Sequence, residues 1–114
     1  MAESKYRVAV IMGSDSDLKV MESCIDTLKK LELPHEVRIL SAHRTPDAVG
    51  KFAASLQDNG FGVVIAAAGM AAHLAGVMAG HTTLPVIGVP MPGGAFDGQD
   101  ALLATVQMPR GVPV

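Results

Sequence analysis

The chain alternates short apolar runs, rich in β-branched residues, with stretches of helical periodicity, and this alternation constrains the fold most. Short apolar runs bounded by turn residues are typical of strands buried on both faces of a sheet. Strand and helix in regular alternation indicate a parallel, doubly wound sheet with helices on both faces, an α/β fold. The predicted strands cover 7–12, 36–40, 62–67 and 85–89.

Helical patterns fill the intervals between these strands. In the first, Leu18, Met21 and Ile25 lie on one stripe. The second begins at Thr45-Pro46-Asp47, which combines a capping hydroxyl, a proline suited to the first turn and an acidic residue. The predicted helices cover 17–31, 46–59, 71–79 and 100–108, and 112–114 is expected to begin a fifth strand.

Composition limits the class of protein. A chain of 114 residues suits one domain, 1–114, and a net charge of −2 argues against nucleic acid or an anionic membrane as a partner. The single cysteine, Cys24, excludes an internal disulfide framework and indicates a reducing, cytoplasmic compartment. The N-terminal residues 1–5 resemble no targeting signal, and no apolar run has the length of a membrane span.

The loop after the first strand, 12–17, has residues suited to a phosphorylated ligand. Gly13 lets the backbone approach a ligand closely, and Ser14 and Ser16 offer hydroxyls and amides near a helix N-terminus. Asp17 could accept hydrogen bonds from sugar hydroxyls. The spacing matches neither the dinucleotide nor the nucleoside-triphosphate motif. Plain helix capping by Ser16 and Asp17 is the alternative.

The loop after the second strand, 41–46, carries a histidine and an arginine. Arg44 can make a forked contact to phosphate, and His43 can move protons near neutral pH. The alternative is a surface His-Arg pair before a helix. Cations are unfavourable at a helix N-terminus unless an anion binds there, so function is favoured.

The loop after the third strand, 66–74, consists almost entirely of small residues. It would bring backbone against a compact ligand, although tight packing of helix on sheet also uses small residues. His73 is either a structural histidine or a ligand contact. The remaining histidines, His35 and His81, are expected to be structural, and no metal site is expected because zinc-ligand spacing is absent. A plain connector is expected at Gly93-Gly94 rather than a lid.

Taken together, the motifs resemble the PurE family of purine biosynthesis. Five segments match in order, of which S-A-H-R-T-P is the most diagnostic: 12–17, 41–46, 68–74, 85–90 and 106–111. The resemblance implies a flavodoxin-like, three-layer fold and a homo-octamer. It also implies an isomerase that moves a carboxylate from the exocyclic nitrogen of an aminoimidazole ribonucleotide to ring carbon four, without metal or other cofactor.

The family's residue roles transfer to matching positions. Ser16, Ser41 and Arg44 would hold the phosphate, and Asp17 the ribose. His43 would be the general acid and base, which agrees with the proton transfers that the reaction needs. The pocket around the base would be lined by Ser14, Gly69, His73 and Leu74.

Two departures and several alternatives stay open. Ala75 stands where the family has proline, and the family continues through another strand and helix past the last motif. The chain could therefore be a truncated, non-catalytic subunit. Direct carboxylation of aminoimidazole ribonucleotide is the enzymatic alternative. A flavin module lacks an aromatic residue in the loops, and a phospho-receiver would need an aspartate after the third strand.

Overall fold

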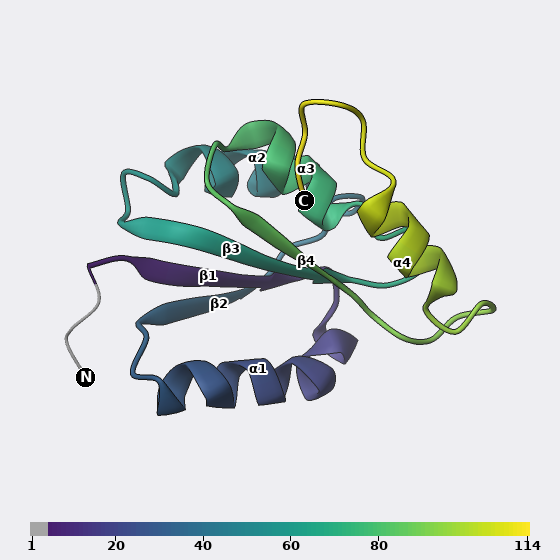
Figure 1. Ribbon diagram of the computed structural model, residues 1–114, viewed down its shortest axis with the longest axis horizontal. Helices are drawn as coiled ribbons and strands as arrows, with labels where there is room; N and C mark the ends of the chain where they lie inside the picture. Colours follow the sequence, from purple (N-terminus) through teal and green to yellow (C-terminus); the bar gives the residue numbers. More distant parts are fainter. Residues whose placement is uncertain (1–4) are drawn as a thin grey trace.

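A computed structural model describes residues 5–114 of the chain. Its centre is a four-stranded sheet in the order β2-β1-β3-β4 (Figure 1). All neighbouring strands are parallel, which confirms the predicted α/β class. The strands are β1 (Arg7–Met12), β2 (His35–Ile39), β3 (Phe61–Ala68) and β4 (Val86–Pro90).

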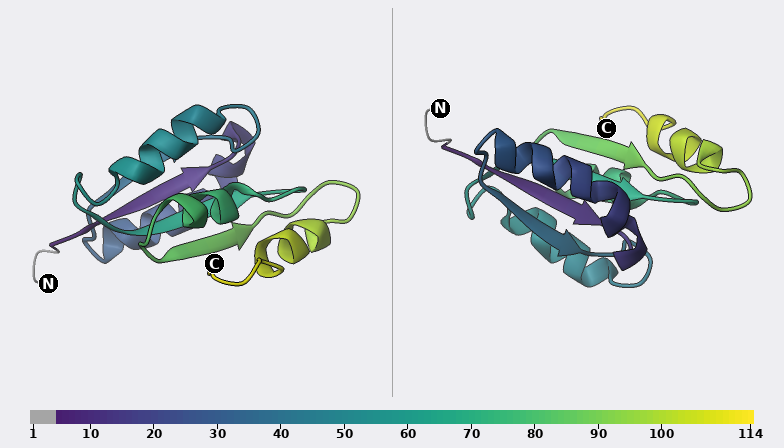
Figure 2. Two further views of the ribbon diagram at one scale, coloured as in Figure 1. Left: turned by 90° about the horizontal axis from the view of Figure 1, so that it is seen from above. Right: turned by 90° about the horizontal axis from the view of Figure 1, so that it is seen from below.

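Helices cover both faces of the sheet and one edge. Helix α1 (Leu18–Lys30) lies on one face, and α2 (Pro46–Ser55) and α3 (Leu74–His81) lie on the other (Figures 1 and 2). Helix α4 (Gln99–Val106) packs beside the edge strand β4. The result is a three-layer arrangement around a central sheet.

Strand β1 is buried on both faces because its side chains alternate between two cores. Val8, Val10 and Met12 belong to the core under α1. Ala9 and Ile11 belong to the core under α2 and α3. This two-sided burial is the reason that β1 is an apolar run rather than an alternating one.

Three segments differ from the sequence prediction by more than two residues. Helix α2 ends at Ser55 rather than at residue 59, because residues 56–60 form turns that lead into β3. Helix α3 begins at Leu74 rather than at residue 71, because the chain first turns through Met70, whose φ is 51°. No strand forms at 112–114. Instead, a Cβ placed on Gly88 of β4 would lie 3.0 Å from a methyl of Val114, so this segment packs over the sheet without pairing to it.

The strand order creates a crevice at one end of the sheet. The chain leaves β1 for β2 on one side, and returns to place β3 on the other side. At such a reversal, the loops that follow the two inner strands diverge and leave room for a ligand. The backbone N–H of Gly13 donates to the carbonyl of Ala67 at 3.0 Å, which ties the first of these loops to β3.

Candidate functional site

A cavity of about 430 Å³ lies in this crevice, at the carboxyl ends of the strands. The loops after β1, β2 and β3 form most of its wall. The structure brings together in it every site residue that the sequence predicted: Ser14, Ser16, Asp17, Ser41, His43, Arg44, Gly69, His73 and Leu74. Their chemical roles remain predictions, but their meeting in one cavity is a structural fact.

Two histidines from different loops are bonded to each other in this cavity. His43 Nε2 lies 2.8 Å from His73 Nδ1, across 30 positions of sequence. The rings meet edge to face, with centroids 4.8 Å apart. Because a hydrogen bond between two imidazole nitrogens contains one hydrogen, one ring must donate and the other accept.

Hydrogen bonds within the loop after β2 hold His43 and Arg44 in place. The hydroxyl of Ser41 accepts from the backbone N–H of Arg44 at 3.0 Å. The hydroxyl of Thr45 accepts from Ser41 N–H at 3.0 Å and donates to the Ser41 carbonyl at 3.1 Å. Thr45 therefore closes the loop, and its side chain makes no capping bond to α2 as the sequence had suggested.

Arg44 is an exposed cation beside the start of α2. Within residues 5–114, its guanidinium has neither a hydrogen-bond nor an ion-pair partner. A positive charge near a helix N-terminus is unfavourable unless an anion compensates it. The arrangement is therefore suited to binding an anionic group inside the cavity.

The loop after β1 is organised by Ser14 instead of by the residues expected to cap the helix. Ser14 Oγ accepts from Ser16 N–H at 3.3 Å and lies 3.0 Å from Ser16 Oγ. It caps the short turn η1 (Asp15–Asp17), which precedes α1. Asp17 makes no side-chain capping bond, so its carboxylate is available to a ligand.

Asp17 is predicted to lower stability at neutral pH. Burial raises the pKa of the Asp17 carboxyl, and a backbone hydrogen bond at Ser14 partly offsets this. Because the folded-state pKa lies above the unfolded value, stability falls as pH rises through it. We therefore expect Asp17→Asn to raise the free energy of unfolding at pH 7, with the gain disappearing at acidic pH.

Urea unfolding of both proteins at pH 7 and at acidic pH measures this effect. The matched control is Asp26→Asn, which changes an exposed carboxylate in the middle of α1. A lower stability of Asp17→Asn at pH 7 would contradict the prediction. A carboxylate that destabilises the fold is typical of functional sites, where ligand binding rather than stability explains its presence.

The loop after β4 forms a fourth wall of the cavity, which was not predicted from the sequence. Pro92, Gly93 and Gly94, which follow β4, line it and were expected to be a plain connector. Gly94 has φ 71°, and a Cβ on it would lie 3.0 Å from Cγ of Met70. Since this loop also follows the carboxyl end of a parallel strand, the same positional argument could have included it.

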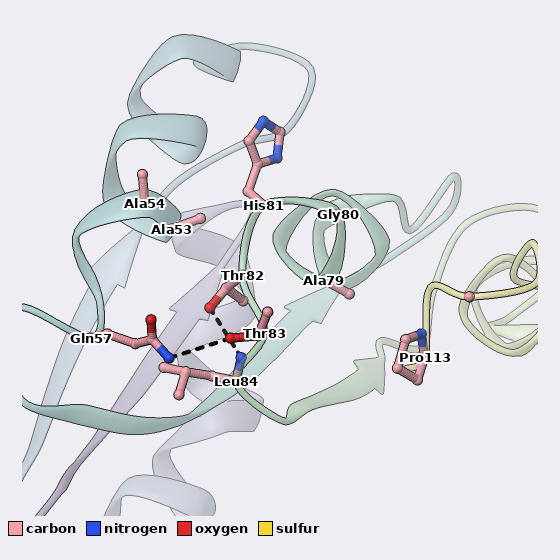
Figure 3. A pocket seen from close by; sticks show the side chains of 11 residues that line it. Ala53, Ala54, Gln57, Ala79, Gly80, His81, Thr82, Thr83, Leu84 and Pro113 are labelled. Atoms are coloured by element: carbon pink, nitrogen blue, oxygen red, sulfur yellow. Dashed lines mark hydrogen bonds between the residues drawn. The ribbon is translucent and has the colours of Figure 1, made fainter.

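A larger cavity, of about 640 Å³, lies where α2 and α3 end and β4 begins (Figure 3). Its polar side chains already bond within the protein. Gln57 Nε2 donates to Thr83 Oγ1 at 3.3 Å, and Thr82 Oγ1 accepts from Leu84 N–H at 3.2 Å. Among residues 5–114, no Asp, Glu, Lys or Arg lines it. It therefore offers less chemistry than the smaller cavity.

The other candidate residues have structural environments. His35 Nδ1 lies 2.9 Å from the carbonyl of Leu33, and His81 Nδ1 lies 2.9 Å from that of Val77. Burial raises the pKa of the Cys24 thiol, which reduces its reactivity. In the described part of the chain, no group of three or more His, Cys, Asp or Glu could hold a metal ion. No helix there has the length and apolar character to cross a membrane.

Comparison with known proteins gives consistent matches. A family model described as AIR carboxylase matches residues 7–114. N5-carboxyaminoimidazole ribonucleotide mutase of Mycobacterium tuberculosis (strain ATCC 25618 / H37Rv) is 54% identical over 113 residues, which cover 99% of this chain and 65% of the relative. The protein of the same name from Escherichia coli (strain K12) is 50% identical, over 95% of this chain and 64% of the relative.

A plant carboxylase and a solved PurE structure are also similar to the chain. The chloroplastic phosphoribosylaminoimidazole carboxylase of Vigna aconitifolia is 56% identical over 91% of this chain, which is 19% of that much longer protein. The crystal structure of Treponema denticola PurE matches with a TM-score of 0.84 and 29% identity, over 94% of this chain and 68% of the other. The chain thus spans a little under two thirds of the length of the mutases that it matches.

Proposed function

The chain belongs to the AIR carboxylase family, and from that premise we propose that it acts as an N5-carboxyaminoimidazole ribonucleotide mutase, an isomerase of purine biosynthesis. The observation that carries the proposal is the meeting of His43, Arg44 and Asp17 in one cavity, in a chain about half identical to proteins of that name. These residues supply a proton-transfer group, a cation for phosphate and a carboxylate for sugar hydroxyls.

His43 is the proposed general acid and base. Protonation of the exocyclic nitrogen releases carbon dioxide and leaves an electron-rich aminoimidazole. Ring carbon four then attacks the carbon dioxide, and His43 removes the proton from that carbon. One imidazole can perform both transfers because its nitrogens bind and release protons near neutral pH. The small residues around Gly69 would keep water away from the carbon dioxide.

The remaining residues are proposed to bind the nucleotide. Arg44 and the hydroxyls of Ser16 and Ser41 would contact the phosphate, and Asp17 the ribose. The hydroxyl hydrogen of Ser41 is suited to this, since its oxygen already accepts from Arg44 N–H. Around the base we place Ser14, Gly69, His73 and Leu74, of which Leu74 is only 2% exposed and so contributes mainly by packing.

Arg44→Ala is predicted to weaken binding of the ribonucleotide about tenfold to a hundredfold, because a hydrogen bond to a charged group contributes about 1.5–3 kcal/mol. The affinity of Arg44→Lys should lie between those of the wild type and Arg44→Ala, because lysine keeps the positive charge but lacks the planar guanidinium. Calorimetric titration with aminoimidazole ribonucleotide measures the effect.

The matched ligand control is the nucleoside that lacks the phosphate. Its affinity should be the same for wild type and Arg44→Ala, because the lost contact is to phosphate. The matched protein control is Arg110→Ala, an exposed arginine outside the cavity. Equal weakening of nucleotide and nucleoside by Arg44→Ala would exclude a phosphate role.

Direct carboxylation of aminoimidazole ribonucleotide is the second candidate. It is favoured by the name of the family and by the carboxylase from Vigna aconitifolia. Two substrates separate the candidates. A mutase converts the carbamate substrate without incorporating ¹³C from added bicarbonate. A carboxylase converts aminoimidazole ribonucleotide, and the ¹³C appears in the carboxylate bonded to carbon four.

We further propose that the chain is cytoplasmic and assembles as a homo-oligomer, an octamer by family resemblance. In this proposal each subunit is catalytic, in contrast to the alternative of a non-catalytic subunit. The proposal is supported by the similarity to the mutases and to the PurE structure. Sedimentation equilibrium of the purified chain measures its mass directly. A mass near eight chains supports the octamer, and a monomer that fails to turn over substrate supports the non-catalytic alternative.

A further inference from the structure

We propose that His73 is a positioning residue that fixes the tautomer of His43, so that the proton-transferring atom of His43 is Nδ1. This inference deepens the proposed function and rests on it for its catalytic meaning. It starts from the 2.8 Å hydrogen bond between His43 Nε2 and His73 Nδ1. That bond occupies one nitrogen of each ring, and within residues 5–114 no protein hydrogen bond occupies the other two.

The direction of this hydrogen bond follows from imidazole chemistry. A neutral histidine side chain prefers to carry its hydrogen on Nε2. If His43 donates from Nε2 to Nδ1 of His73, both rings have this preferred form. The opposite direction would require both rings to carry hydrogen on Nδ1. The intrinsic preference of both rings, applied to this contact, therefore favours His43 as the donor, which leaves its Nδ1 with a free lone pair.

A free lone pair at Nδ1 is the form of His43 that the last step of the reaction needs. The C–H bond at carbon four breaks, its electrons return to the ring, and the proton forms an N–H bond at Nδ1. The first step starts from His43 in its imidazolium form, whose Nδ1 carries the proton taken from carbon four in the preceding turnover. This N–H bond breaks, its electron pair stays on Nδ1, and the proton bonds to the exocyclic nitrogen. The C–N bond to the carboxyl group then breaks, with its electron pair left on nitrogen, and carbon dioxide leaves.

His73 can also take part of the positive charge when His43 is protonated. The Nε2–H bond of His43 can lengthen toward Nδ1 of His73 while Nδ1 of His43 retains its proton. The hydrogen stays bonded to Nε2 of His43 throughout, so no atom is gained or lost and the tautomer of His43 is kept. His73 thus acts through His43 rather than by contact with the reacting atoms.

Nitrogen NMR of the complete chain, labelled with ¹⁵N-histidine, tests the tautomer without any substrate. We expect the cross-peak pattern of an Nε2–H ring for His43, and a coupling through the hydrogen bond to Nδ1 of His73. His73→Asn should preserve the pattern, because the amide oxygen lies near the position of Nδ1 and can accept. His73→Phe removes the acceptor and leaves only the intrinsic preference for Nε2–H, so a minor population of the Nδ1–H form should appear.

An Nδ1–H or mixed pattern for His43 in the wild type would overturn the proposal, as would an unchanged pattern in His73→Phe. The wild-type spectrum decides this even if a variant folds poorly. If His43 shows the Nε2–H pattern in a chain that does not convert the carbamate, the proposed function is refuted. The role of His73 in positioning His43 is then still supported.

Separate measurement of kcat and KM tests the positioning role in the active enzyme. His73→Phe should lower kcat by about tenfold to 10⁴-fold with little change in KM, as expected when a histidine loses the partner that sets its tautomer. His73→Asn should retain more of kcat. A raised KM with unchanged kcat would make His73 a substrate contact instead, and would overturn the proposal.

Discussion

Replacing His43 with asparagine should lower turnover of the carbamate substrate by about 10²- to 10⁴-fold, the range that general acid-base catalysis contributes. The expected change in the free energy of unfolding is within about 0.5 kcal/mol, because the side chain is exposed. Steady-state kinetics and urea unfolding of the same preparation measure the two quantities. Loss of turnover in a protein of unchanged stability is the signature of a catalytic side chain.

Two further variants control for this result. His81→Asn changes another exposed histidine, whose ring contacts the carbonyl of Val77 at 2.9 Å and lines the other cavity. Its turnover should be that of the wild type. His43→Gln places an amide near the position of Nε2 and can keep the bond to His73, but it cannot transfer protons. Wild-type turnover in either His43 variant would remove this residue from the mechanism.

Leu74→Ala should lower the free energy of unfolding by about 2–5 kcal/mol, the cost of removing a large side chain from a packed core. Leu74 is 2% exposed and belongs to the core under α2 and α3. A change of this size is a large part of the stability of a small domain. Urea unfolding monitored by circular dichroism measures it.

The matched control is Leu31→Ala, at the end of α1, where the side chain is 44% exposed. Its effect should be within about 0.5 kcal/mol. If Leu74→Ala left stability unchanged and lowered only substrate affinity, Leu74 would be a pocket residue and not a core residue.

The sheet was predictable because burial leaves a plain signal in the sequence. After Arg7, the run at 8–12 has only apolar side chains on both faces, and the observed β1 has the predicted bounds, 7–12. The start of α3 was less predictable. Residues 71–73 are as compatible with helix as those that follow, and no local pattern marks the turn at Met70, whose φ is 51°.

The candidate site was predictable in its residues but not in its internal contacts. A positional rule for parallel sheets selected the loops after β1, β2 and β3, and the structure places them around one cavity. The bond between His43 and His73 could not be predicted, because it joins loops 30 positions apart and depends on how close β2 and β3 bring them. The loop at Gly93-Gly94, in contrast, could have been included by the same positional rule, because it follows the carboxyl end of β4.

The most direct test of the central claim, that these loops form one ribonucleotide site, is an NMR titration. Aminoimidazole ribonucleotide is added to the ¹⁵N-labelled chain while backbone amide shifts are recorded. We predict that the amides of Ser14, Arg44 and His73 shift together and saturate at one ligand concentration. Shifts confined to residues 79–84, around the other cavity, or no saturable shifts at all, would contradict the account.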